Sequence, residues 1–157
     1  LRITFRKENP DDYDFLVELY GSTREDVIKY GSHLSQKERR EFISNQFKLQ
    51  SEHYSNKYRK AKYQIITDDG KDVGRLVTNK SKSSMHVVFF ALLPKVQSKG
   101  IGSTIFKSLI SKAHADNKIV SIYVNKQNEN AKAFYDKLGF VLKEGGTDFY
   151  DYMETEI

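Results

Sequence analysis

The chain has 157 residues, and its 26 Lys and Arg against 21 Asp and Glu give a formal net charge of +5. It contains no cysteine, which excludes disulfides, thiolate nucleophiles and cysteine-based metal sites, and its four histidines lack the spacing of metal ligands. No apolar run is long enough for a transmembrane helix, and residues 1–10 lack the apolar segment of a secretory signal. We therefore expect one soluble, cytoplasmic domain over residues 1–157, with no metal and no membrane partner.

The positive charge does not by itself indicate a nucleic-acid-binding protein. Lys and Arg are spread along the whole chain and form no basic block interleaved with aromatic residues. That distribution disfavours nucleic acid as a partner, and a soluble anionic ligand is the simpler explanation of the charge.

The first elements are a strand and a helix. Residues 1–7 alternate apolar and polar side chains, which is the pattern of a half-buried strand. Asn9 is a good N-cap and Pro10 suits the first helical position, so a helix begins there. We expect Gly21 to end it.

Two more helices follow. The spacing of a capping box occurs at Ser22 and again at Ser35, each with a Glu three residues later. The first predicts a short helix through Ile28. The second predicts a longer surface helix through about Tyr54, because its apolar stripe is ragged.

The rest of the chain alternates strands and helices. Residues 85–93 (MHVVFFALL) are almost all apolar, which predicts a central strand buried on both faces. The other expected elements are a hairpin of strands 63–67 and 73–78, a polar loop 79–84, a helix 101–113, a strand 118–124, a helix 128–138 ended by Gly139, and final strands 140–143 and 148–153. This order predicts an α/β (α+β) protein with a mixed sheet and helices on both faces.

Glycines stand at the junction between the apolar strand and the helix that follows it, in the segment LLPKVQSKGIGST. The first turn of a helix has N–H groups with no intrahelical acceptor, so it attracts anions. Gly100 and Gly102 let phosphate oxygens approach the backbone, and Lys95 and Lys99 add positive charge. The spacing matches neither a P-loop nor a dinucleotide-binding motif. A plain strand-to-helix turn is the alternative.

Two segments carry a family resemblance. Residues 97–102 (QSKGIG) resemble the acetyl-CoA pyrophosphate loop of the Gcn5-related N-acetyltransferases (GNAT), and residues 128–140 (NENAKAFYDKLGF) resemble the later signature of that superfamily. The resemblance is strong from about Met85 to Phe140. It implies the GNAT fold, a mostly antiparallel central sheet splayed at its middle strand, and acetyl-CoA as co-substrate.

The resemblance also implies cofactor-binding residues. The backbone of Leu92 and Leu93, at the end of the central strand, would pair with the pantetheine arm of the cofactor. Asn128 would also contact that arm. Asn128 is equally an N-cap candidate. The pyrophosphate would be held by seven consecutive residues, namely Gln97, Ser98, Lys99, Gly100, Ile101, Gly102 and Ser103.

Two residues are candidates for catalysis. Tyr135 matches the tyrosine that protonates the departing CoA thiolate and would also contact the cofactor; its alternative role is that of a core aromatic residue. His86 falls where several members of the family carry a general base, and imidazole chemistry suits that role. A structural histidine, with water as the base, is the alternative. The backbone N–H near Leu92 is the candidate oxyanion donor.

We therefore expect an N-acetyltransferase that moves an acetyl group from acetyl-CoA to a primary amine by direct attack in a ternary complex. The acceptor would be a small-molecule or peptide amine. A non-catalytic acyl-CoA-binding sensor of the same fold is the alternative. The chain could act as a monomer or a homodimer, since its last segment could pair with a neighbouring sheet.

Overall fold

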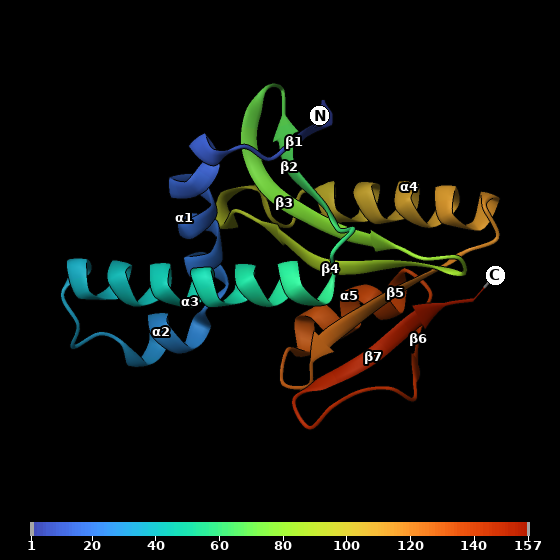
Figure 1. Ribbon diagram of the computed structural model, residues 1–157. Coiled ribbons are helices and arrows are strands. Elements are labelled where there is room, and N and C mark those ends of the chain that lie inside the picture. Colours follow the sequence, from blue (N-terminus) through green and yellow to red (C-terminus); the bar gives the residue numbers. More distant parts are fainter. Residues whose placement is uncertain (1, 157) are drawn as a thin grey trace. The chain divides into compact units, whose positions relative to one another are not determined.

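The computed structural model describes residues 2–156 and contains one seven-stranded sheet in the order β1-β2-β3-β4-β5-β7-β6 (Figure 1). Its contacts divide the chain into two compact units. The N-terminal unit comprises residues up to Val77 and Phe89–Gln97, and the C-terminal unit comprises Thr78–Val88 and the residues from Ser98 on. One domain over 1–157 stays a prediction, and the units are described separately below.

The N-terminal unit follows the expected order of elements. It contains β1 (Ile3–Lys7), the short 3-10 helix η1 (Pro10–Asp12), α1 (Tyr13–Thr23), α2 (Glu25–Tyr30), α3 (Gln36–Lys57), β2 (Lys62–Asp68), most of β3 (Lys71–Lys80), the end of β4 (Ser84–Leu92) and the 3-10 helix η2 (Pro94–Val96). β1 pairs with β2 in antiparallel register from Ile3 opposite Asp68 to Lys7 opposite Gln64. The expected first strand is thereby confirmed.

Gly21 does not end the first helix, so that prediction is wrong. The helix continues to Thr23, and Ser22 Oγ donates a hydrogen bond of 2.6 Å to the Leu19 carbonyl inside it. A Cβ on Gly21 would lie 3.3 Å from a methyl carbon of Ile43 on α3. The glycine therefore permits close packing where α1 crosses α3 (Figure 1).

The two expected capping boxes have different outcomes. Ser22 lies inside α1, so it cannot cap α2, which begins after Arg24 and runs to Tyr30. At Ser35 the capping box is confirmed, because Ser35 and Glu38 exchange hydrogen bonds of 3.0 and 3.1 Å. The helix that it begins extends to Lys57, three residues beyond the expected end.

The expected hairpin is present as β2 and β3. Asp69 and Gly70 between them both have positive φ, 51° and 80°, which is the geometry of a tight hairpin turn. β3 continues to Lys80 and β4 begins at Ser84, so the polar segment 79–84 is only partly a loop.

The C-terminal unit contains the end of β3, the start of β4 and the elements that follow the glycine loop. These are α4 (Ile101–Ala115), β5 (Ile119–Asn125), α5 (Glu129–Lys137), β6 (Phe140–Lys143) and β7 (Tyr150–Thr155). β4 pairs with β5 in parallel over Ser84–Val87, whereas β7 pairs antiparallel with both β5 and β6. The mixed, mostly antiparallel sheet is confirmed, and its splay stays a prediction.

Aromatic side chains form the core between α4 and α5 in this unit. Phe106 of α4 is fully buried and packs edge-on against Phe134, Tyr135 and Phe140 at centroid distances of 5.3–6.1 Å. Such edge-to-face contacts fix ring positions as well as burying area. They hold α5 against α4 through Tyr135.

The central strand is less buried than its composition predicts. Val87, Ala91 and Leu92 of β4 are buried, but Met85 and His86 are only half-buried. The three residues 88–90 in the middle of the strand are also only half-buried, so burial on both faces is wrong for most of the strand. In the described residues no helix is both long and apolar enough to cross a membrane.

Candidate active site

The loop after β4 has a backbone that few side chains tolerate. After η2, Gln97 is extended with φ −73° and ψ 161°, and Ser98 then has a φ of 61°. Gly100 lies in the left-handed region with φ 82° and ψ 2°, directly before α4. A Cβ there would meet no atom within 4 Å, so the backbone conformation, rather than crowding, requires glycine.

The N-terminus of α4 is open to an anion. α4 has no side-chain cap, and α1 and α2 also lack one, but only α4 of these three has no acidic residue in its first turn. Thr104 is the first residue whose N–H bonds back into the helix, 3.0 Å from the Gly100 carbonyl. Lys95 and Lys99 are exposed in the loop. The uncapped N–H groups and the helix dipole together attract negative charge.

Hydrogen bonds occupy part of the backbone at the end of β4. The Leu93 N–H donates to the Val73 carbonyl at 2.8 Å, and the Leu93 carbonyl accepts from Val96 N at 3.0 Å. Gln97 Nε2 donates to the Leu92 carbonyl at 2.9 Å. Since neighbouring N–H groups of a strand point to opposite edges, the Leu92 N–H points away from β3. Of the two residues expected to pair with the pantetheine arm, Leu92 therefore has the backbone N–H that is better placed to do so.

Gln97 differs from its expected role in one respect. Its backbone N–H donates to the Pro94 carbonyl at 3.2 Å and so already has a partner. The side chain steadies the turn through Leu92 instead. A pyrophosphate would therefore meet the backbone of Ser98 and the residues after it more readily than that of Gln97.

Asn128 is the N-cap of α5. Its Oδ1 accepts a hydrogen bond of 3.1 Å from the Ala131 N–H. The capping role is thus confirmed, and contact with the cofactor arm stays a prediction. α5 ends at Lys137, and Gly139 follows its C-cap Leu138 with a φ of 94°, so the expected glycine stop after this helix is confirmed.

Tyr135 is a buried phenol on α5. Only 7% of its surface is exposed, and its ring packs against Phe106, Phe134 and Phe140. Burial raises the pKa of Tyr135 well above its ordinary value. Among residues 2–156 its hydroxyl has no hydrogen-bond partner. The geometry therefore combines a fixed ring with a hydroxyl that keeps its proton and is available to donate it.

His86 lies on β4 beside two residues of β5. The parallel register places it opposite Ser121, and its Nδ1 is 2.8 Å from Ser121 Oγ. Its ring also packs edge-on against Tyr123 at a centroid distance of 5.3 Å. These contacts fix the orientation of the ring.

Ser121 connects His86 to further polar groups that no pattern in the sequence indicates. The Ser121 side chain is almost fully buried, and its Oγ lies 3.0 Å from Ser84 Oγ. It also hydrogen-bonds Tyr152, whose hydroxyl donates to Glu154 Oε2 at 3.0 Å. Burial raises the pKa of Tyr152, and the hydrogen bond to Ser121 acts in the opposite direction. Strand register creates this cluster, and register was the missing signal.

The expected site residues are distributed over both units. Leu92, Leu93 and Gln97 belong to the N-terminal unit, and the others belong to the C-terminal unit. Within the C-terminal unit, the packing of Phe106 on Tyr135 connects the helix that follows the glycine loop to the candidate acid. No group of three His, Cys, Asp or Glu side chains that could hold a metal ion occurs among the described residues.

Comparison with solved structures supports this fold over the whole chain. The PaiA N-acetyltransferase of Thermoplasma acidophilum, solved with coenzyme A, is 20% identical with a TM-score of 0.70, and the match covers 100% of both chains. An acetyltransferase of Thermus thermophilus is 13% identical with a TM-score of 0.70, covering 100% of this chain and 98% of that one. A GNAT family acetyltransferase of Elizabethkingia anophelis, with acetyl-CoA bound, is 14% identical with a TM-score of 0.62, covering 99% and 98%.

The sequence itself also matches a family model. Residues 30–151 match the model of the acetyltransferase (GNAT) domain, which is most of the chain. No curated protein matches the sequence. The matched residues include the glycine loop, the uncapped start of α4 and the Tyr135 segment. This chain belongs to the GNAT acetyltransferase family.

Proposed function

We propose that the protein transfers an acetyl group from acetyl-CoA to a primary amine by direct attack in a ternary complex. The observation that carries the proposal is the uncapped N-terminus of α4 behind the left-handed Gly100, in a chain of this family. Related structures solved with coenzyme A or acetyl-CoA support the choice of co-substrate. The acceptor is a small-molecule or peptide amine, and the protein acts as a monomer or homodimer in the cytoplasm.

The glycine loop would bind the pyrophosphate of the co-substrate. The backbone N–H groups from Ser98 to Ser103 supply donors, and the positive end of the α4 dipole faces them. Lys95 and Lys99 contribute mobile positive charge nearby. Acetyl-CoA supplies the activated thioester, and the protein supplies binding, orientation and proton transfer.

His86 is the proposed general base. An ammonium group is not a nucleophile, so the acceptor must lose a proton before its nitrogen attacks the thioester carbonyl. In this proposal Nδ1 carries the ring proton and donates it in a hydrogen bond to Ser121 Oγ, 2.8 Å away, and Nε2 takes the proton from the acceptor amine. The Leu92 N–H, directed away from β3, would donate to the negative charge that develops on the carbonyl oxygen.

Tyr135 is the proposed general acid. When the carbon–sulfur bond breaks, the electron pair stays on sulfur, and the thiolate accepts a proton from the phenol. The raised pKa of Tyr135 keeps the phenol protonated at neutral pH until that moment. Its three aromatic neighbours hold the ring in one orientation.

Release of the CoA thiol over a panel of amines tests the proposal directly. A thiol-reactive dye suits this protein because the chain has no cysteine of its own to react. We expect turnover with wild type, a decrease of about 10²–10⁴-fold for Tyr135→Phe and a comparable decrease for His86→Ala. Activity that survives His86→Ala would assign the base to water.

A non-catalytic acyl-CoA sensor is the second candidate function. Calorimetry with acetyl-CoA separates it from the enzyme, since a sensor binds the ligand but releases no thiol with any amine. Absence of binding at millimolar acetyl-CoA would refute both functions. The aligned loop and Tyr135 segments favour the enzyme, because a sensor needs no acid.

A further inference from the structure

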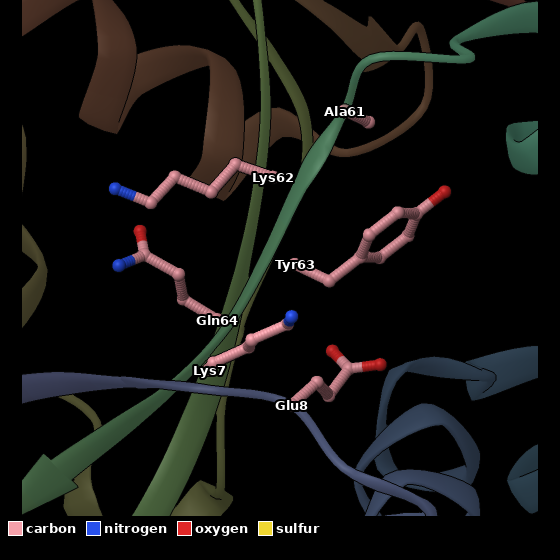
Figure 2. A pocket seen from close by; sticks show the side chains of 6 residues that line it. All are labelled: Lys7, Glu8, Ala61, Lys62, Tyr63 and Gln64. Atoms are coloured by element: carbon pink, nitrogen blue, oxygen red, sulfur yellow. The ribbon is translucent and has the colours of Figure 1, made fainter.

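The N-terminal unit contains two adjoining cavities that have no role in the proposed acetyl transfer. One has a volume of about 510 Å³ and is lined by the end of β1, the start of β2 and the residues next to them, among them Lys7, Glu8 and Tyr63 (Figure 2). The other, of about 400 Å³, lies against α3 and is lined by Ser51 and Arg75 among others. Glu8 and Tyr63 line both cavities and so form their common wall.

Arg75 is a buried cation with one unsatisfied end. Its side chain is 3% exposed, and Nε and Nη2 donate to the two carboxylate oxygens of Glu8 at 2.7 and 3.0 Å. The guanidinium carbon lies 5.5–5.6 Å from the ring centroids of Phe47, Tyr63 and Phe89. Within residues 2–156, Nη1 has no hydrogen-bond partner.

Tyr63 adds a second unsatisfied group to the same wall. Its hydroxyl is buried and also lacks a partner in the described part of the chain. Figure 2 shows the side chains of Tyr63 and Glu8 on one side of β2, with Lys62 and Gln64 directed to the other. The aromatic rings around Arg75 compensate its charge in part, but they offer nothing to the Tyr63 hydroxyl.

Two buried polar groups without partners in one wall need an explanation. Each unsatisfied group costs folding free energy, and native proteins contain few of them. Both groups can donate a hydrogen bond, so each of them needs an oxygen acceptor. Lys7 and Arg75 on the cavity walls outnumber the single carboxylate of Glu8, which favours an anionic acceptor.

We propose that the cavity between Tyr63 and Arg75 binds a small carboxylate with an apolar body. The carboxylate accepts from Tyr63 Oη and Arg75 Nη1, and the apolar body packs against Phe47 and Tyr13 in the cavity against α3. Because both donor atoms are shielded from solvent, entry requires a side-chain rotation. The half-buried ring of Tyr63 on the common wall is the group that rotates.

Protein-observed NMR with 3-phenylpropionate tests the site in the absence of acetyl-CoA, so the result does not depend on the proposed acetyl transfer. We expect the amides of Ser51, Ser55 and Tyr63 to shift on titration. The neutral alcohol 3-phenylpropanol, of matched size, should bind at least about tenfold more weakly, because hydrogen bonds to a charged group are stronger.

A pair of Tyr→Phe variants provides the control. Tyr63→Phe removes an unsatisfied hydroxyl, so it should leave the melting temperature unchanged or raise it. The same change should weaken the binding of 3-phenylpropionate about tenfold. Tyr20→Phe removes a hydroxyl that accepts from Arg24 Nη1 at 3.0 Å, so it should lower the melting temperature and leave binding unchanged. Unchanged binding in Tyr63→Phe, shifts confined to other residues, or no binding at millimolar 3-phenylpropionate would overturn the proposal.

Discussion

Ser121 shows how a single buried hydroxyl can organise a candidate site. It lies in the middle of β5 and contacts Ser84, His86 and Tyr152 from the two neighbouring strands. Its type and position give no signal in the sequence. Only the register of β4 on β5 places it opposite His86, and register depends on pairing between segments more than 30 residues apart. His86 could be proposed from the sequence, but its partner could not.

Replacement of Ser121 tests whether positioning of His86 matters for turnover. We expect Ser121→Ala to lower kcat about tenfold with little change in KM for acetyl-CoA, because the imidazole loses the partner that orients it. Steady-state kinetics by thiol release measures both constants. Ser84→Ala is the matched control, since Ser84 contacts Ser121 but has no hydrogen bond to His86, and its kcat should stay near wild type. Equal losses in the two variants would count against a positioning role.

Helix ends were predictable where a local side chain forms the cap. Asn128 and Ser35 both cap helices as expected, because the partner N–H lies three residues away in the chain. The expectation failed at Gly21 and Ser22, where packing decided the outcome. The close contact of Gly21 with Ile43 stabilises a longer α1, and Ser22 then donates a hydrogen bond to the Leu19 carbonyl within that helix. Tertiary contact thus overrode a local signal.

Gly100→Ala tests the element that carries the proposed function. Alanine at a φ of 82° costs about 1–2 kcal/mol of unfolding free energy, and relaxation of the loop would misdirect the N–H groups before α4. We expect a lower melting temperature together with a weaker Kd for acetyl-CoA by calorimetry.

Gly70→Ala is the control that separates the loss of stability from the loss of acetyl-CoA affinity expected for Gly100→Ala. Gly70 has a φ of 80°, and an added Cβ there also meets no atom within 4 Å, but the residue lies in the turn between β2 and β3. It should lose similar stability and keep wild-type affinity for acetyl-CoA. If Gly70→Ala weakened acetyl-CoA equally, the loss in Gly100→Ala would reflect stability alone.

At the scale of the whole molecule, the order of elements was predictable and the division into units was not. Apolar periodicity and turn residues gave nearly every strand and helix, because these patterns are local. The boundary between the units cuts through β3 and β4, and no change of composition marks it. The cavity wall of Tyr63 and Arg75 was also beyond sequence reasoning, since Arg75 meets Glu8 across 67 positions of the chain.

Acid should destabilise the molecule through its N-terminal unit. The described carboxyls with lowered pKa values are Asp12, Asp26 and Glu38, all in that unit. A hydrogen bond from Arg6 is the main cause at Asp12, with Arg6 distances of 2.6 and 3.0 Å to its two oxygens. Each of these carboxyls has a lower pKa in the folded protein than in the unfolded chain, so its ionised form stabilises the fold. The stabilisation is fully present at a pH above the pKa of the unfolded chain, and it is lost as the pH falls through the pKa of the folded protein.

Melting temperature as a function of pH measures this contribution. Wild type should be nearly constant from about pH 7 to pH 5 and should fall below about pH 4, where unfolded Asp and Glu begin to bind protons. Asp12→Asn should lose about 1–2 kcal/mol at pH 7, since Arg6 is partly screened by solvent, and it should fall less steeply in acid. Asp136→Asn in the exposed surface of α5 should reproduce the wild-type curve. If Asp12→Asn kept the full acid slope, the Arg6–Asp12 pair would not be a source of acid sensitivity.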